Sequence, residues 1–515
     1  MVLNAARIVV AAALLLQGGT AKPRDSEESQ RTKRYVVREA AMADVSQPAP
    51  ALPDLAPYNE AAVRARLGEN APGRAVLRRM VDLEALGEFV SGQQRDRLVE
   101  WARRQNTNPR VISIEGGRMT LADLVRALPD DLLEEEEPGI YTLRLPILVA
   151  QGATLLIDRD VRELRLSQDA GAFLVNDGRL FVLGTRITGW RERERSPASF
   201  RDGREFRPFL VSWGGAELYV TNSRISHLGY SASKAYGISV SQYSPGRQKR
   251  MQRPSPVAWL LNSEFINNWF GFYCFEADDV VIIGNRYDDN IVYGVDPHDR
   301  SHRLIIAGNT IHNTRKKHGL IVSREVNDSW IFDNVIGDNK LSGLVLDRSS
   351  VRNVVADNTV YDNGSDGITV YESPDNLIWG NRSIGNDKHG IRVRNSVGVK
   401  LYNNRVIANR FAGIYGHVKD LHGTDRNLQL DPFEQQVSMV VVGGQLVHNG
   451  SGPVSIDKPL SLELFDVDLL APSSATGITL DGVLGEYQHR VLDLLVRRRR
   501  PVLIEPADKP VRGQS

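Results

Sequence analysis

The fold is decided by the stretch from Asn334 to Tyr371, which reads NVIGDNKLSGLVLDRSSVRNVVADNTVYDNGSDGITVY. Within this stretch an Asn returns after 24 residues, at Asn358, and so does a Gly, from Gly343 to Gly367. Each of these Gly residues is followed by a short run in which apolar side chains recur at every second position. Such alternation is typical of β-strands. The stretch therefore predicts repeated units, each built from short strands and a corner.

The same two positions recur through a longer part of the chain, at steps of 23 to 25 residues. The Asn series is Asn262, Asn285, Asn309, Asn334, Asn358, Asn381 and Asn404. The Gly series is Gly271, Gly294, Gly319, Gly343, Gly367, Gly390 and Gly413. Leucine-rich repeats have a similar period, but they need a Leu-dominated consensus and a helical turn in each unit. These units are rich in Val, Ile and Asn, so we predict an all-β fold, a right-handed parallel β-helix (solenoid) with hydrogen-bonded Asn in its turns and Gly at its corners.

The rest of the chain divides around this solenoid. Arg7, the apolar run 8–16 and small residues up to Ala21 predict a cleaved secretory signal peptide over residues 1–21. A membrane anchor is the alternative, but the apolar run is shorter than the roughly 20 residues that a membrane span needs. We expect residues 22–135 to be a linker and a short helical N-terminal extension, because apolar residues recur there at helical spacing. Residues 136–485 are expected to form the β-helix with its active groove, and residues 486–515 a C-terminal cap and tail.

Composition excludes several classes of function. The 64 Lys and Arg residues balance 63 Asp and Glu residues, so no overall charge favours nucleic acid as a partner. Cys274 is the only cysteine, which rules out an internal disulfide and a thiolate metal cluster. No group of His, Asp and Glu has metal-ligand spacing, so we predict no metal and no cofactor. The basic run 497–500 is interpreted as a solvated helix end.

The corner Gly residues also predict which side chains face outward. If the residue after each Gly points into the core, alternation turns the second and fourth residues to the surface. The second positions hold Tyr273, Asp296, Ile321, Val345, Thr369, Arg392 and Tyr415, and the fourth positions hold Phe275, His298, Ser323, Asp347, Tyr371, Arg394 and His417. Stacked strands lie about 4.8 Å apart, close to the length of one sugar in an extended chain, so this face suits a polysaccharide.

One coil departs from the repeat. After Gly294 the chain reads Val-Asp-Pro-His-Asp, and Pro297 is poorly suited to an interior strand. Local departures of this kind are expected at functional sites. His298 is predicted to face outward with a carboxylate on either side in the sequence, and such neighbours orient an imidazole and favour its charged form. We therefore predict that His298 is a general base.

Arg324 is the predicted partner of this base. It lies 26 residues after His298, on the next coil, at the fifth position after Gly319. Strict alternation would turn it inward, so the prediction requires the strand to end near Ser323. An Arg bound to the carboxylate of a uronate would stabilise the negative charge that builds up as His298 removes the neighbouring proton.

Other polar residues of the face are predicted to bind or orient a substrate, since aromatic faces support sugar rings and Arg binds carboxylates. This set consists of Asp296, Asp299, Tyr293, Asp347, Tyr371, Arg392 and Arg394. His318 and His389 each precede a corner Gly and are interpreted as turn residues. His417 is expected to contact substrate without taking part in the reaction.

The hexapeptide DPHDRS, residues 296–301, followed by SREVNDSW, residues 323–330, resembles the periplasmic mannuronan C5-epimerases of bacterial alginate biosynthesis. The resemblance extends over nearly the whole chain. It implies periplasmic conversion of β-D-mannuronate to α-L-guluronate within the polymer, with His298 removing the C5 proton and Arg324 neutralising the carboxylate. A proton returned to the opposite face would come from water, with Tyr293 as an alternative donor. The implied partners are the polymannuronate (alginate) chain and other periplasmic alginate secretion proteins.

Two other functions remain open at this level. A polysaccharide lyase shares the first half of the mechanism, because the same enolate can expel the C4 oxygen and cut the chain. A non-catalytic periplasmic guide would bind nascent polymer without changing it. A β-helix by itself also suits pectate lyases and phage tailspikes, so the fold does not separate these functions.

Overall fold

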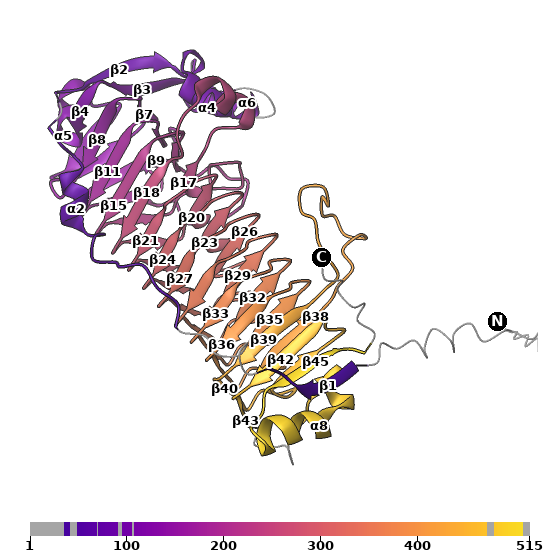
Figure 1. The fold of residues 1–515 in the computed structure, drawn as a ribbon. Helices are drawn as coiled ribbons and strands as arrows, with labels where there is room; N and C mark the ends of the chain where they lie inside the picture. Colours follow the sequence, from indigo (N-terminus) through magenta and orange to yellow (C-terminus); the bar gives the residue numbers. More distant parts are fainter. Residues whose placement is uncertain are drawn as a thin grey trace, which may run out of the picture.

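The computed structural model describes residues 35–41, 49–69, 71–90, 95–105, 108–470 and 478–507. Within them, short strands stack into three sheets that run the length of an elongated molecule, as Figure 1 shows. Each sheet has fifteen strands, and in the central coils neighbouring strands of a sheet are parallel. The predicted parallel β-helix is confirmed. The predicted signal peptide lies outside the described residues, among which no helix is long and apolar enough to cross a membrane.

One sheet carries the predicted outward face and is called the groove sheet below. Its strands are β2 (Arg74–Arg79), β3 (Arg110–Glu115), β7 (Ile147–Val149), β10 (Leu174–Asn176), β14 (Leu210–Trp213), β17 (Gly237–Ser241), β20 (Phe270–Phe275), β23 (Tyr293–His298), β26 (Leu320–Ser323), β29 (Leu344–Asp347), β32 (Ile368–Tyr371), β35 (Ile391–Arg394), β38 (Ile414–His417), β41 (Val454–Ile456) and β44 (Asp481–Gly482). A second sheet extends from β4 (Gly117–Thr120) to β39 (Ser438–Val442), β42 (Ser461–Phe465) and β45 (Val502–Pro506), and the third from β5 (Leu133–Glu137) and β6 (Ile140–Leu143) to β43 (Asp468–Leu470).

The alternation counted from each corner Gly is present in the groove sheet. In β26 and β29 the first and third residues after the Gly belong to the central hydrophobic core, Leu320 and Val322 in β26 and Leu344 and Leu346 in β29. The second and fourth residues therefore project from the opposite face of the sheet. This arrangement places the predicted site residues on one surface.

Asn side chains form a continuous ladder inside the turns. The backbone N–H of each ladder residue donates to Oδ1 of the Asn on the next coil, at 2.9 to 3.0 Å from Asn285 to Asn404. Asn262 is not a member, because the N–H of Ser263 donates to Asn285 in its place and Asn262 is exposed. Since buried amides must be hydrogen-bonded, this ladder keeps the coils in register.

The corner Gly residues are required for close packing between coils and not for a left-handed backbone. A Cβ built on Gly294 would lie 2.6 Å from the carbonyl oxygen of Gly319 on the next coil. None of the seven corner Gly residues has a positive φ. Left-handed backbone instead occurs just after the groove strands, at polar residues such as Asp299 and Arg324.

The N-terminal extension contains the predicted helices, but it also contributes strands. Its helices are α2 (Glu60–Ala65), α3 (Gly87–Val90), α4 (Arg95–Gln105) and α5 (Leu121–Ala127). Strands β3 and β4 already pair in parallel with β7 and β8 (Ala153–Ile157). The solenoid therefore begins upstream of the boundary predicted at residue 136. Its first strands, β3 and β4, lack the repeat signal of the middle coils.

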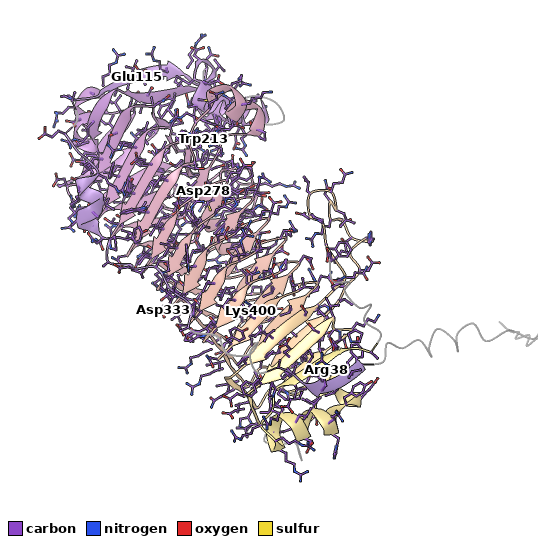
Figure 2. All side chains as sticks on the ribbon, viewed as in Figure 1. Arg38, Glu115, Trp213, Asp278, Asp333 and Lys400 are labelled. Carbon is purple, nitrogen blue, oxygen red and sulfur yellow. The ribbon has the colours of Figure 1, made fainter. Side chains whose placement is uncertain are left out.

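The first and last strands of the described residues pair at one end of the solenoid. Strand β1 (Tyr35–Glu39) pairs antiparallel with β45. In the sequence, β45 follows the cap helices α7 (Val483–Glu486) and α8 (Gln488–Leu492). Figure 2 places Arg38 at this end and Glu115 at the opposite end. Between them, Leu52 and Leu55 pack along the outside of the second sheet. The N-terminal segment thus runs back along the coils before the first coil begins.

Candidate active site

His298 ends strand β23 on the outward face of the groove sheet, with 22% of its side chain exposed. Its Nδ1 is hydrogen-bonded to the carboxylate of Asp299. The backbone turns left-handed at Asp299 and Arg300, with φ of 38° and 50°, which brings the side chains of these sequence neighbours together. A carboxylate on Nδ1 fixes the tautomer that carries its lone pair on Nε2. The imidazole is therefore arranged to accept a proton at Nε2.

Arg324 stands beside this pair on the next coil. His298 lies in register with Ser323, the last residue of β26, so the strand ends where the prediction requires. Arg324 follows the strand with a φ of 63°, so its side chain need not point inward as alternation along a strand would require. Its Nη1 lies 3.7 Å from Oδ1 of Asp299. The structure therefore brings together the predicted base and the predicted cation.

Asp299 is the acidic centre of this group. Burial favours its neutral form, but the hydrogen bond to His298 and the charges of His298, Arg324 and Arg300 outweigh it and lower the pKa of Asp299 below its usual value. A carboxylate held in its charged form stabilises an imidazolium next to it. Asp299 is thus suited to support His298 when the ring takes up a proton.

Asp296 behaves differently from the prediction that it orients His298. It is buried, and its Oδ1 has no hydrogen-bond partner among the described residues. Burial raises its pKa to about 7. A carboxyl group of this kind is protonated over part of the neutral range, where it donates rather than accepts a hydrogen bond. Asp299, not Asp296, forms the contact with the imidazole.

Tyr293 starts the strand that His298 ends, five residues away, which is roughly 16 Å of extended chain. Its hydroxyl accepts a hydrogen bond from Nζ of Lys317 at 3.2 Å, and its ring stacks on His318. Burial raises the pKa of Tyr293. The structure therefore does not bring Tyr293 next to His298.

The remaining predicted residues extend the face toward the C-terminal end. Asp347 accepts a hydrogen bond from Ser323 at 3.3 Å, and burial raises its pKa. Arg394 lies 3.8 Å from the ring centre of Tyr371 and is also paired with Glu372. Arg392 lies two residues before Arg394 and on the same face, and its Nε is 3.1 Å from Nε2 of His417. Tyr371, Arg392 and Arg394 form a surface of ring and cations on the third and fourth coils after His298, whereas Asp347 lies on the second.

Lys234 was missed by the sequence analysis. It lies in the irregular turn before β17, outside the clean repeat, and its Nζ sits 3.4 Å from the ring centre of Phe275. Phe275 is in register with His298 on the neighbouring strand. Burial lowers the pKa of Lys234 to about 7. Lys234 and Phe275 also line a pocket with Glu88 of α3, so the N-terminal extension reaches the edge of the site.

Asp431 was also missed, because 107 residues of sequence separate it from Arg324. It accepts hydrogen bonds from Nε and Nη2 of Arg324 at 2.8 and 3.0 Å. Among the described residues, no three His, Cys, Asp or Glu side chains gather to hold a metal ion. The site thus consists of an imidazole, carboxylates and cations on one face of the solenoid.

Comparison with known proteins shows the family to which the chain belongs. The family model for the right handed beta helix region matches residues 210–351 and 299–422. The mannuronan C5-epimerase of Pseudomonas aeruginosa is 57% identical over 486 residues, which cover 94% of this chain and 89% of that protein. The mannuronan C5-epimerase AlgG of Azotobacter vinelandii is 54% identical over 475 residues, covering 92% and 90%. The chain belongs to the mannuronan C5-epimerase family.

A solved structure of this family has the same fold. The crystal structure of the periplasmic alginate epimerase AlgG superposes with a TM-score of 0.81 at 49% identity, covering 82% of this chain and 99% of that one. This epimerase is accordingly a periplasmic isomerase. The resemblance inferred from the DPHDRS motif is confirmed.

Proposed function

We propose that this epimerase converts β-D-mannuronate to α-L-guluronate within polymannuronate. In this proposal His298 removes the C5 proton, Arg324 neutralises the neighbouring carboxylate, and a proton returns to the opposite face of C5. The observation that carries the proposal is the contact of one carboxylate, Asp299, with both His298 and Arg324.

The first step requires a base and a stabilised anion. Asp299 leaves Nε2 of His298 as the proton acceptor and supports the imidazolium that forms. Loss of the C5 proton places negative charge on the uronate carboxylate, beside which Nη1 of Arg324 would stand. A cation held at that place stabilises the enolate-like transition state more than the ground state.

The second step needs a proton donor on the opposite face of the sugar. We propose water for this role. Tyr293, the alternative donor, begins the strand that His298 ends, too far along it to serve the same sugar.

The outward rings and cations of the later coils support binding of neighbouring sugars of the same polymer. Contact with other alginate secretion proteins belongs to this proposal as an implication of the family resemblance.

A lyase is the competing reaction, since it starts from the same enolate. The test is to incubate polymannuronate with the protein, then follow the guluronate signal by proton NMR and the absorbance of unsaturated uronate. We expect guluronate to accumulate without unsaturated ends. Strong absorbance with no guluronate signal would replace the epimerase proposal with a lyase. Polymer binding with neither product would indicate a non-catalytic guide.

A further inference from the structure

The loop of residues 418–437 joins β38 to β39 and interrupts the repeat. A second Asn ladder runs through the neighbouring turns, and its step lengthens from 23 residues between Asn386 and Asn409 to 40 residues between Asn409 and Asn449. Figure 1 shows this loop standing beside the groove sheet and reaching back from β38 toward β26. A long loop that returns over a site often has a function.

The loop is fastened to one row of residues, those that directly follow the groove strands. The backbone of Lys419 makes two hydrogen bonds with the side chain of Asn395. Arg426 pairs with Glu372, one coil closer to the N-terminal end. Asp431 continues in the same direction and binds Arg324. The loop therefore lies along the row, with charges opposite to those that it meets.

Asp431 makes the last of these contacts. Its side chain is 2% exposed, and it binds the Nε and Nη2 edge of the Arg324 guanidinium with both oxygens. Arg348 approaches the same carboxylate at 3.9 Å. Such two-pronged pairs fix the plane of a guanidinium as well as its position. The contact does not use the Nη1 end, which points toward Asp299.

We propose that Asp431 is a positioning residue for the epimerase reaction: it holds Arg324 so that the Nη1 end faces the sugar whose proton His298 removes. The inference rests on the proposed role of Arg324 in neutralising the substrate carboxylate. The Nη1 end makes only the longer ion pair of 3.7 Å with Asp299, and a substrate carboxylate would approach Arg324 at this end. Asp431 binds the Nε and Nη2 edge, so it does not compete with a substrate carboxylate for the Nη1 end.

The test is the kinetics of Asp431→Asn on polymannuronate, with guluronate followed by proton NMR. The amide keeps the size of the side chain but cannot accept with both atoms, so Arg324 loses its fixed orientation. Because small misplacements of a reacting group lower rates steeply, we expect kcat to fall about 10- to 100-fold while KM changes less than about 3-fold. Asp431→Glu should recover part of the lost kcat.

Matched variants separate positioning from damage to the loop. Asp425 is an exposed carboxylate of the same loop, and Asp425→Asn should match the wild type. Arg426→Gln loosens the loop without touching Arg324 and should lose much less kcat than Asp431→Asn. Equal losses in these two variants, unchanged kcat in Asp431→Asn, or a lower KM with higher kcat/KM would each overturn the inference.

Arg324→Ala distinguishes failure of this inference from failure of the proposed function. If Arg324→Ala is inactive and Asp431→Asn is normal, only the role of Asp431 is wrong. If Arg324→Ala turns over like the wild type, the proposed mechanism is wrong and the inference falls with it.

Discussion

The carboxylate of Asp299 contacts Nδ1 of His298 and lies 3.7 Å from Nη1 of Arg324, so one acidic side chain joins the two residues proposed for the reaction. Two of these residues are sequence neighbours and the third is on the next coil. The left-handed backbone after β23 and β26 brings them together.

Replacement of the base should abolish the reaction but not binding. We expect His298→Ala to form no detectable guluronate, because no other group takes the C5 proton, while polymannuronate binding stays within about 3-fold of wild type by calorimetry. His302→Ala is the control, since His302 is partly exposed and its ring is paired with Asp278 and not with Asp299. Guluronate formation by His298→Ala at a wild-type rate would contradict the proposed base.

Loss of the charge on Asp299 should slow the reaction even though the ring remains. Asp299→Asn removes the acceptor that fixes the imidazole tautomer, and comparable changes in other enzymes lower kcat by up to about 10⁴-fold. We expect a loss of about 10²-fold or more, measured as the initial rate of guluronate formation. The matched control is Asp278→Asn, which breaks an Asp and His pair outside the groove. Equal rates in the two variants would rule out the orienting role.

The buried carboxyl of Asp296 should make stability depend on pH. Its pKa is about 7 in the folded protein and about 4 in the unfolded chain, so between these values the folded state holds more protons. The free energy of unfolding therefore falls as pH rises from about 4 to about 7, by up to about 4 kcal/mol. Asp296→Asn lacks this loss and should melt above wild type at about pH 8 and close to it at about pH 4.5. A gap that does not widen with pH would contradict the prediction.

Lys234 should assist binding only while it is charged. Its pKa of about 7 means that the ammonium forms as pH falls through neutrality. We expect Lys234→Met, which keeps the apolar stem over Phe275, to lower kcat/KM about 10-fold near pH 6 and by much less near pH 8.5. Lys316 also covers aromatic rings, those of Phe200 and Trp269, and Lys316→Met serves as the control. The prediction fails if the ratio of wild type to Lys234→Met is the same at both pH values.

Membership of the hydrogen-bonded ladder, and not a place in the sequence repeat, should decide how much an Asn contributes to stability. Asn334 is buried and bonds to both neighbouring ladder residues. Asn334→Ala leaves buried groups without partners and should destabilise the fold by about 2 to 4 kcal/mol. Asn262, which shares the repeat but is exposed, should lose only the roughly 1 kcal/mol that Ala costs in left-handed backbone, because its φ is 48°. Thermal unfolding followed by circular dichroism compares the two, and similar losses would contradict a role set by the ladder.

The sequence by itself determined the coil period, the alternation of side chains along the groove strands and the placement of His298 and Arg324 on neighbouring coils, but not the direction of the Arg324 side chain. These features depend on local periodicity, because alternation along a strand and one-coil offsets follow directly from residue counting. The same counting misplaced Asn262 by one residue and put the start of the solenoid too late, since end coils do not share the repeat.

Only the tertiary structure decided which groups complete the site. Asp431 and Lys234 come from an inserted loop and an irregular turn, and chain folding, not spacing, brings them to Arg324 and Phe275. The choice of Asp299 over Asp296 as the partner of His298 depended on a left-handed turn that alternation does not predict. Burial by itself raises the pKa of both carboxyl groups. It dominates at Asp296, whereas at Asp299 the hydrogen bond to His298 and the nearby cations outweigh it and lower the pKa.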